Sequence, residues 1–173
     1  QAAGLTCTGF GMGVAVADYD NDGFPDSYVT RYGANTLLHN QGDGTFRDTT
    51  VSSDVGCELW SLGAAFADLD QDGDLDLFVA NYLEFDPALA PFARDPVTGK
   101  PDFGLPPSFD GQPDVLYFND GDGRFTDVTS HAEISDSARG MGVLAADLDE
   151  DGKVDILVAN DAEENILWRN RGA

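Results

Sequence analysis

Aspartates recur at fixed spacing in three short stretches of the chain. The stretches are Asp18–Asp26, Asp68–Asp76 and Asp147–Asp155, here called loop 1, loop 2 and loop 3. Each follows the pattern D-x-D-x-D-G-x-x-D, with carboxylates at positions 1, 3, 5 and 9 and glycine at position 6. In such a loop alternate side chains point inward, and the glycine permits the sharp turn that brings the position 7 carbonyl round. The pattern predicts binding of a hard cation by oxygen atoms.

Calcium suits these loops better than magnesium does. Calcium accepts six to eight oxygen ligands in a flexible geometry, whereas magnesium requires an octahedron and keeps its waters. Without a cation, four carboxylates crowded into one loop would repel one another. We therefore expect about three Ca²⁺ ions, one in each loop. The predicted ligands, with position 7 contributing only its backbone carbonyl, are Asp18, Asp20, Asp22, Phe24 and Asp26, then Asp68, Asp70, Asp72, Asp74 and Asp76, then Asp147, Asp149, Asp151, Lys153 and Asp155.

Two other settings for such loops are excluded by the residue at position 12. An EF-hand needs a bidentate glutamate there, between two helices, and a dockerin-type loop also needs a carboxylate. Position 12 is instead Val29, Val79 or Val158, each within an apolar stretch. A single acidic turn could also be nothing more than a solvated surface, but threefold recurrence at identical spacing makes that explanation weak.

The composition limits the class of partner. The chain has 173 residues, enough for one domain with a core, and a formal charge of −23. Of its 32 acidic residues, 14 lie in the three loops. Nucleic acids and anionic membranes both require clustered lysine and arginine, so neither is expected as a partner. No apolar run approaches the roughly 18 residues of a membrane span, so we expect no membrane insertion.

The two cysteines, Cys7 and Cys57, lie at corresponding places, each six residues before a glycine of its repeat unit. A disulfide between them and two free thiols both remain open, because the Cα atoms must approach within about 7 Å to be bridged. There is no C-x-x-C motif, so a redox role is not expected. Calcium loops of modest affinity work mainly where calcium is plentiful, which favours an extracellular or periplasmic location.

Short strands must hold these loops, because the same order of apolar stretches surrounds each one. Strands are expected at 11–17, 27–30, 36–39 and 46–49, at 63–67, 77–80, 115–118 and 125–128, and at 140–146, 156–159 and 165–168. Gly-Asp-Gly turns at 42–44 and 121–123 indicate hairpins. A repeat of about 50 residues with several short strands is typical of a propeller blade.

We therefore predict an all-β segment made of four-stranded antiparallel β-propeller blades. The units run over residues 11–50, 61–130 and 139–173, the last incomplete, in one segment covering 1–173. Residues 1–5 resemble the end of a preceding unit. Propellers close with four or more blades, and open sheet edges pair or aggregate. About three blades therefore imply a larger, six- or seven-bladed propeller, completed by more chain, a second copy or a larger assembly.

One insertion interrupts the second unit at residues 82–113. It holds seven of the eight prolines and five aromatic residues. Long loops of this kind inside compact domains are uncommon and often functional. The aromatic residues either pack back on the blade or meet a partner.

The assembled motifs resemble the FG-GAP/VCBS repeat family, and most closely its cartilage acidic protein-like branch, which carries ASPIC/UnbV domains. The residues that carry the resemblance are Gly13-Val-Ala-Val-Ala-Asp18-x-Asp20-x-Asp22-Gly23 and Asn40-Gln-Gly42-Asp43-Gly44-Thr-Phe46, with their counterparts in the other units. The resemblance implies a β-propeller like that of integrin α-subunits, with calcium in the loop that joins the first two strands of each blade. It also implies a secreted protein that acts in adhesion or interaction.

We expect a non-catalytic, calcium-stabilised module that serves as a binding, adhesion or structural scaffold for a protein or glycan partner. No catalytic triad, acid pair or H-E-x-x-H motif is present, and His39 and His131 read as ordinary residues. The alternative is a carbohydrate-binding, lectin-like propeller. Trp60 and Trp168 fall at different places in their units, which favours packing over a sugar platform.

Overall fold

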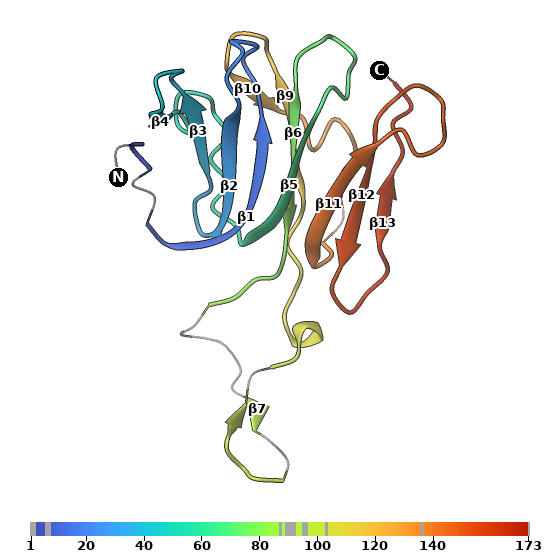
Figure 1. Cartoon of the computed structure of the whole chain (residues 1–173). Helices are drawn as coiled ribbons and strands as arrows, with labels where there is room; N and C mark the ends of the chain where they lie inside the picture. The colour runs from blue at the N-terminus through green and yellow to red at the C-terminus, as the bar shows by residue number, and fades with distance from the viewer. Residues whose placement is uncertain are drawn as a thin grey trace.

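The computed structural model describes residues 3–5, 8–86, 88, 93–94, 97–102, 104–135 and 137–172. Within these residues the chain forms three antiparallel sheets that stand side by side, and a small separate hairpin (Figure 1). The sheets have four, four and three strands, in the orders β1-β2-β3-β4, β10-β9-β6-β5 and β11-β12-β13. The all-β prediction is confirmed, and the three sheets are consistent with propeller blades. They are called blades 1, 2 and 3 below.

The strands lie where the repeat alignment predicted them, to within two residues at each end. Blade 1 comprises β1 (Phe10–Ala17), β2 (Asp26–Tyr32), β3 (Thr36–Asn40) and β4 (Phe46–Asp48). Blade 2 comprises β5 (Ser61–Ala67), β6 (Asp76–Asn81), β9 (Val115–Asn119) and β10 (Phe125–Asp127). Blade 3 comprises β11 (Gly140–Ala146), β12 (Asp155–Asn160) and β13 (Ile166–Trp168).

The first strand of every blade carries the same irregularity. The pairing of β1 with β2 shifts between Gly11 and Gly13, so that Met12 falls outside the ladder. Leu62 and Met141 take the same place in β5 and β11. One extra residue in one strand is a β-bulge, which turns the backbone out of the ladder.

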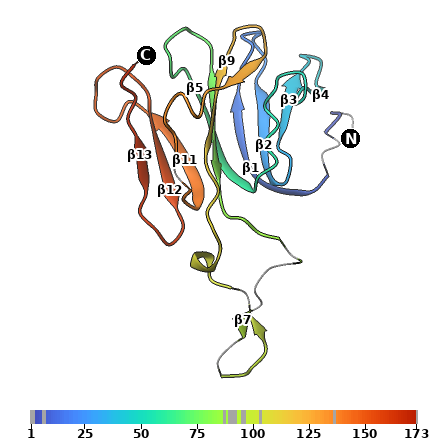
Figure 2. The same cartoon turned by 180° about the vertical axis from the view of Figure 1, so that it is seen from behind.

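The bulges bring the inner strands β1, β5 and β11 into close contact (Figure 1, Figure 2). A Cβ built on Gly13 would lie 2.4 Å from the carbonyl oxygen of Leu62. A Cβ on Gly63 would lie 3.1 Å from the carbonyl oxygen of Met141. The bulge carbonyl of each following blade therefore rests on the glycine of the blade before it, and only a residue without a side chain permits that approach.

The core consists of two clusters, one at each junction between neighbouring blades. Cluster 1 contains Tyr19, Tyr28, Leu37 and Val55 with Leu77, Val79, Tyr117 and Phe125. Cluster 2 contains Leu69, Phe78, Ala80, Leu116 and Ile134 with Ile156 and Val158. Burial of these faces removes apolar surface from water, so contact between blades contributes to the stability of the fold.

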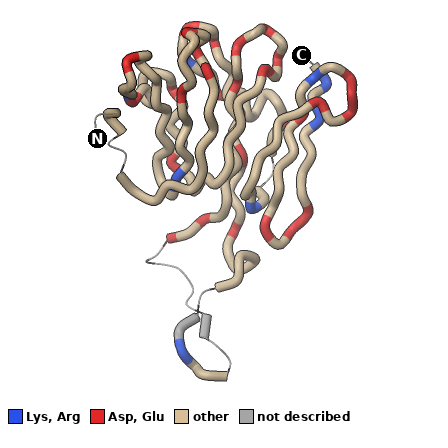
Figure 3. The backbone as a smooth tube through the Cα atoms, in the orientation of Figure 1, with Lys and Arg blue, Asp and Glu red and all other residues tan. Residues whose placement is uncertain are grey.

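The insertion leaves the end of blade 2 that is opposite to the acidic loops (Figure 1, Figure 3). It contains a hairpin that the sequence did not predict, β7 (Ala93–Arg94) with β8 (Pro101–Asp102), and a 3₁₀ turn, η1 (Pro106–Ser108). Among the residues the structure describes, no helix is long and apolar enough to cross a membrane.

The base of the insertion is fixed by aromatic packing. The ring of Trp60 lies edge-on to Tyr82 at 5.2 Å and to Phe85 at 5.8 Å, and Phe85 lies 5.7 Å from Phe109, between ring centroids. The described aromatic residues therefore pack back on the blade. Trp60 is a packing residue, as expected, and Trp168 packs against cluster 2. Phe92 and Phe103 lie outside the described residues.

Candidate metal centres

The three acidic loops lie together at one end of the blades, where Figure 3 shows acidic residues gathered. Strand β1 ends at Ala17 and β2 begins at Asp26, so positions 1 to 8 of loop 1 form the hairpin connection and position 9 starts the next strand. Loops 2 and 3 have the same placement, between β5 and β6 and between β11 and β12. Apolar stretches on both sides of each loop form the two strands, which pair antiparallel across it.

The position 9 aspartate is buried and joins its loop to the third strand of the blade. Asp26 is 0 % exposed, its Oδ2 accepts from the backbone N–H of Tyr19 at 3.3 Å, and its Oδ1 accepts from that of Asn40 at 2.7 Å. The same two bonds recur from Leu69 and Asn119 to Asp76, and from Leu148 and Asn170 to Asp155. Position 9 thus fixes the geometry of the loop as well as presenting a carboxylate to it.

Burial makes these carboxylates costly to ionise. The pKa of Asp76 is raised to about 6, chiefly by burial and in part by nearby Asp70 and Asp72, although the N–H groups of Asn119 and Leu69 oppose the rise. Burial also raises the pKa of Asp26 and of Asp70. A carboxylate held in this way is stabilised by a proton or by a cation.

The turn of each loop is closed by its position 1 aspartate. Asp18 Oδ2 accepts from the N–H of Gly23 at 2.9 Å, and Gly23 has a φ of 91°. Position 1 accepts from position 6 in the other two loops as well. Position 4 also has a left-handed backbone although it is never glycine: Asn21, Gln71 and Glu150 have φ values of 56°, 67° and 62°. The sequence predicted the turn at the position 6 glycine, but it did not predict the left-handed backbone at position 4.

Each loop brings together the oxygens of three carboxylates, within 4.8 Å of one another. The groups are Asp18, Asp20 and Asp22 in loop 1, Asp68, Asp70 and Asp76 in loop 2, and Asp147, Asp149 and Asp155 in loop 3. A fourth group joins Asp20 and Asp26 with a ring nitrogen of His39. The remaining predicted side-chain ligands are not in these groups. Asp72 accepts from the N–H of Asp74 at 2.9 Å, and Asp151 lies 2.9 Å from the Lys153 ammonium.

A hard cation fits the loops, and loop 2 most clearly. Asp20 Oδ1 and Asp68 Oδ1 are buried and have no hydrogen-bond partner among the described residues. Within the described part of the chain, no lysine, arginine or histidine nitrogen lies within 4 Å of a loop 2 carboxylate. A buried oxygen without a partner is costly, and a set of oxygen donors alone is what calcium prefers.

His39 lies in strand β3 and faces loop 1, a contact that its interpretation as an ordinary residue did not anticipate. Its Nδ1 lies 3.1 Å from Asp20 Oδ2 and 3.4 Å from Asp26 Oδ1. His39 immediately precedes the asparagine that ends the third strand of blade 1. The corresponding residue is Phe118 in blade 2 and Arg169 in blade 3, where the Arg169 guanidinium pairs with Asp149. The three loops therefore differ in the basic groups that face them.

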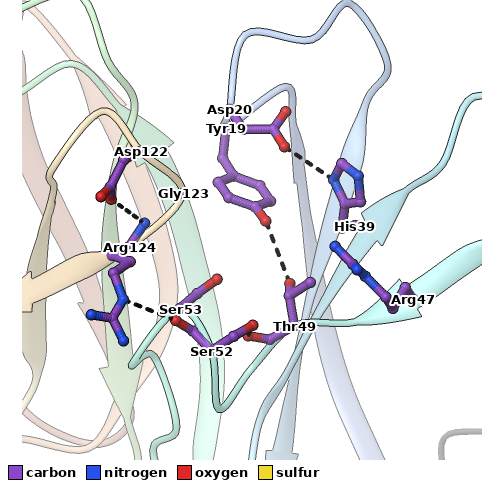
Figure 4. Close-up of a pocket in the computed structure, with 10 residues that line it drawn as sticks. All are labelled: Tyr19, Asp20, His39, Arg47, Thr49, Ser52, Ser53, Asp122, Gly123 and Arg124. Atoms are coloured by element: carbon purple, nitrogen blue, oxygen red, sulfur yellow. Dashed lines mark hydrogen bonds and ion pairs between the residues drawn. The ribbon is translucent and has the colours of Figure 1, made fainter.

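A cavity of about 410 Å³ opens beside loop 1, between blades 1 and 2 (Figure 4). Its walls include His39 and Asp20 on one side and Arg124 of blade 2 on the other. The Tyr19 hydroxyl lies 3.4 Å from the Thr49 hydroxyl inside it. The cavity makes the carboxylate of Asp20 reachable from the blade junction.

Cys57 is buried, with its Sγ 3.8 Å from Asn81 Oδ1 and 3.8 Å from Ser61 Oγ. Cys7 lies outside the described residues. A bridge between the two cysteines therefore stays a prediction.

Polar side chains link neighbouring loops in series. The Asn21 amide donates to Asp74 Oδ1 at 2.7 Å, which ties position 4 of loop 1 to position 7 of loop 2. The Gln71 amide donates to the carbonyl of Gly152 at 2.8 Å, which ties loop 2 to loop 3. The side chain at position 7, which the sequence treated as free to vary, thus takes part in the contact between loops 1 and 2.

The motifs and the geometry agree with a comparison against known protein families. A search of curated proteins found no match. The FG-GAP-like repeat family matches the chain over residues 18–79 and 98–158. The first match contains loops 1 and 2, and the second contains loop 3. The chain therefore belongs to the FG-GAP-like repeat family.

Proposed function

We propose that this chain is a calcium-stabilised β-propeller module of a secreted protein. One observation carries the proposal: three loops share one hydrogen-bonded geometry around buried aspartates, and buried carboxylate oxygens in two of them have no partner among the described residues. Carboxylates packed in this way supply the oxygen ligands that calcium requires, and loop 2 supplies them with no basic side chain beside them.

The aspartates at positions 1, 3 and 9 would hold the ion, joined by position 5 and by the position 7 carbonyl. The bound ion supplies the positive charge that offsets repulsion among the carboxylates. The chain itself positions the ligands: position 6 N–H groups orient position 1, and the third-strand asparagine orients position 9. Calcium would thus join the hairpin of each blade to its third strand.

Calcium should stabilise the fold by mass action, because the unfolded chain has no formed loops. One site adds about 2.7 kcal/mol when free calcium is 100 times its Kd. Stabilisation by bound calcium requires that calcium be abundant, which supports an extracellular or periplasmic location. We propose a non-catalytic role, in adhesion or as a scaffold for a protein or glycan partner. Placement in the cartilage acidic protein-like branch rests on the quoted motifs and the insertion.

The test is isothermal titration of the chelator-stripped chain with calcium, together with thermal unfolding in calcium and in chelator. About three ions should bind, and the unfolding midpoint should rise with calcium. Asp70→Asn should remove one binding event, because it changes the loop that lacks a basic neighbour. Asp54→Asn is the matched control, since it removes the same charge from an exposed turn outside the loops. Absence of calcium binding, or an unchanged midpoint, would overturn the proposal.

A further inference from the structure

A second cavity, of about 310 Å³, opens at the base of the insertion, at the end of the blades opposite to the acidic loops (Figure 1). It is called the basal cavity below. Its walls combine three aromatic residues with three acidic ones, which are Tyr32, Trp60, Phe85, Glu58, Glu84 and Asp86. Pockets for small molecules span about 300 to 1,000 Å³, so the basal cavity is large enough for one side chain and little more.

The three aromatic rings stand at large angles to one another. The ring centroid of Tyr32 lies 5.2 Å from that of Trp60, with the ring planes at 83°. The centroid of Phe85 lies 6.3 Å from Tyr32 at 65° and 5.8 Å from Trp60 at 61°. Because the rings are not stacked, one ring does not cover the face of the next. An aromatic face carries partial negative charge, so these rings offer a cation an apolar surface of favourable sign.

The acidic residues of the basal cavity have no positive partner in the described part of the chain. No basic nitrogen there lies within 4 Å of the carboxylates of Glu58, Glu84 or Asp86. Asp86 accepts from the N–H of Ala88 at 2.8 Å, which is a neutral donor. The cavity beside loop 1 differs, because two arginines and a histidine line it. Of the two cavities, the basal one is therefore suited to a cation.

Hydrogen bonds between distant segments hold the walls of the basal cavity in place. The Tyr32 hydroxyl of blade 1 donates to the carbonyl of Phe85 in the insertion at 2.8 Å. The Gln112 side chain accepts from the backbone N–H of Trp60 at 2.9 Å, and so joins the end of the insertion to the start of blade 2. The rings are therefore positioned by the fold itself, and a ligand does not have to order them.

The junction of blades 2 and 3 holds a guanidinium at the corresponding place. Trp60 directly precedes β5, and Arg139 directly precedes β11. Arg139 Nη1 lies 3.0 Å from Glu163 Oε1, and its Nη2 donates to the carbonyl of Phe109 at 2.6 Å. This end of a blade junction thus accommodates a guanidinium beside a carboxylate. At the junction of blades 1 and 2 the described residues supply aromatic rings and carboxylates around the cavity, but no cation.

We propose that the basal cavity binds the side chain of an arginine carried by a protein partner. A guanidinium is planar, stacks on aromatic faces, loses water more readily than an ammonium and donates to carboxylates in pairs, so it suits both kinds of wall. The arginine belongs to a peptide chain because the α-carboxylate of the free amino acid would be repelled by the three acidic residues. The inference rests on the proposed role in binding a protein partner, and it names the group that the partner must present.

The experiment is an NMR titration of the full chain, in calcium-containing buffer, with N-acetylarginine amide. The indole N–H signal of Trp60 reports on the cavity, and Trp168→Phe identifies this signal because the chain has two tryptophans. The signal should shift saturably as the arginine amide binds. N-acetylcitrulline amide has nearly the same shape without the charge and should bind at least about tenfold more weakly. Free arginine should bind at least about threefold more weakly.

Single substitutions test the two kinds of wall separately. Glu84→Gln removes a carboxylate and should weaken binding of the arginine amide by about two- to fivefold, as the loss of an exposed ion pair does. Phe85→Leu keeps apolar bulk but removes the ring, and should weaken binding by about twofold or more. Glu133→Gln is the matched control, since it removes the same charge from an exposed turn outside the cavity and should bind like wild type. Circular dichroism must first show that each variant is folded, and Glu58→Gln replaces Phe85→Leu if the latter does not fold.

Three results would overturn the inference. They are a Trp60 signal that does not respond, a citrulline amide or free arginine that binds as tightly as the arginine amide, and a Glu133→Gln variant that loses as much affinity as Glu84→Gln. The last would mean that the formal charge of −23 attracts any cation. Calcium binding is measured separately. A chain that binds calcium but not the arginine amide would refute this inference alone, and the reverse result would refute only the proposed role of calcium.

Discussion

The side-chain amide of Asn119 donates a hydrogen bond to the backbone carbonyl of Tyr19, 2.8 Å away and 100 residues earlier in the chain. Asn119 ends the third strand of blade 2, and Tyr19 lies at position 2 of loop 1. The same amide donates to the carbonyl of Leu75 at 3.2 Å, just before the position 9 aspartate of its own blade. One residue therefore connects two acidic loops that belong to different sheets.

Asn119→Ala should destabilise the chain by about 2–3 kcal/mol, because it leaves buried carbonyls without donors. Asn40→Ala removes the corresponding residue of blade 1, whose amide donates only to the carbonyl of Pro25 among the described residues. Its cost should be about 1 kcal/mol. Urea unfolding of both variants in calcium measures the difference. If both variants lose the same unfolding free energy, the hydrogen bond from Asn119 to Tyr19 adds nothing to the bond that each asparagine makes within its own blade.

Gly13→Ala should destabilise the chain and Gly142→Ala should not, although the two glycines hold corresponding positions. A Cβ on Gly13 would lie 2.4 Å from the Leu62 carbonyl, so the inner strands must separate, at a cost of about 1–3 kcal/mol. A Cβ on Gly142 would meet only Ala159 at 4.0 Å, and its effect on the free energy of unfolding should stay within about 0.5 kcal/mol. Thermal unfolding at low protein concentration compares them. A destabilised Gly142→Ala would contradict the open space that the structure shows around this glycine.

Arg169→Gln should tighten calcium binding at loop 3. The Arg169 guanidinium pairs with Asp149, a predicted ligand, and therefore competes with a cation for the same carboxylate. An exposed pair of this kind is worth up to about 1 kcal/mol, so the affinity should rise by about three- to fivefold. Lys100→Ala is the charge-matched control, since Lys100 is exposed in the insertion. Calorimetric titration measures the calcium affinities. If Lys100→Ala raises the affinity as much as Arg169→Gln does, the loss of one positive charge explains the gain and the pairing with Asp149 does not.

In chelator, Asp76 should make stability fall as pH rises. Burial raises its pKa in the folded chain to about 6, against 3.8 for an ordinary aspartate. The folded state therefore binds this proton more tightly, so the contribution is full below about pH 4 and is lost as pH rises through about 6. Asp76→Asn removes the titration. Urea unfolding at pH 4 to 7 should show a steeper loss for wild type than for the variant. If the free energy of unfolding falls equally with pH in both proteins, general charge repulsion causes the loss and Asp76 does not.

The sequence predicted the strands and loops well because their causes are local. Alternating apolar residues, Gly-Asp-Gly turns and aspartates at fixed spacing recur in three units, and alignment of the units located every blade strand to within two residues. Position 9 was predicted to be a metal ligand. Its second role, as acceptor of two backbone N–H groups, depends on the third strand and appears only once the sheet is formed.

The sequence did not predict what depends on contact between distant segments. His39 faces Asp20 because β3 lies beside β2, and neither residue carries a motif for the pairing. The hairpin of β7 and β8 has two residues in each strand, too few for a hydrophobic period. The αL backbone at Asn21, Gln71 and Glu150 was missed because these residue types share no requirement for positive φ. Aligning the residue before Asn40, Asn119 and Asn170, which gives histidine, phenylalanine and arginine, could have shown that the loops differ.

The placement of β6 between two clusters has a consequence for how the chain opens. All six residues of β6 are buried, and blade 2 has a neighbour on each side, whereas blades 1 and 3 each have one. In a linear array whose stability is a sum over units and their nearest neighbours, the terminal units fray first. Amide hydrogens of β6 should therefore exchange with solvent most slowly, and those of the outer blades should exchange through partial openings that leave the middle blade folded.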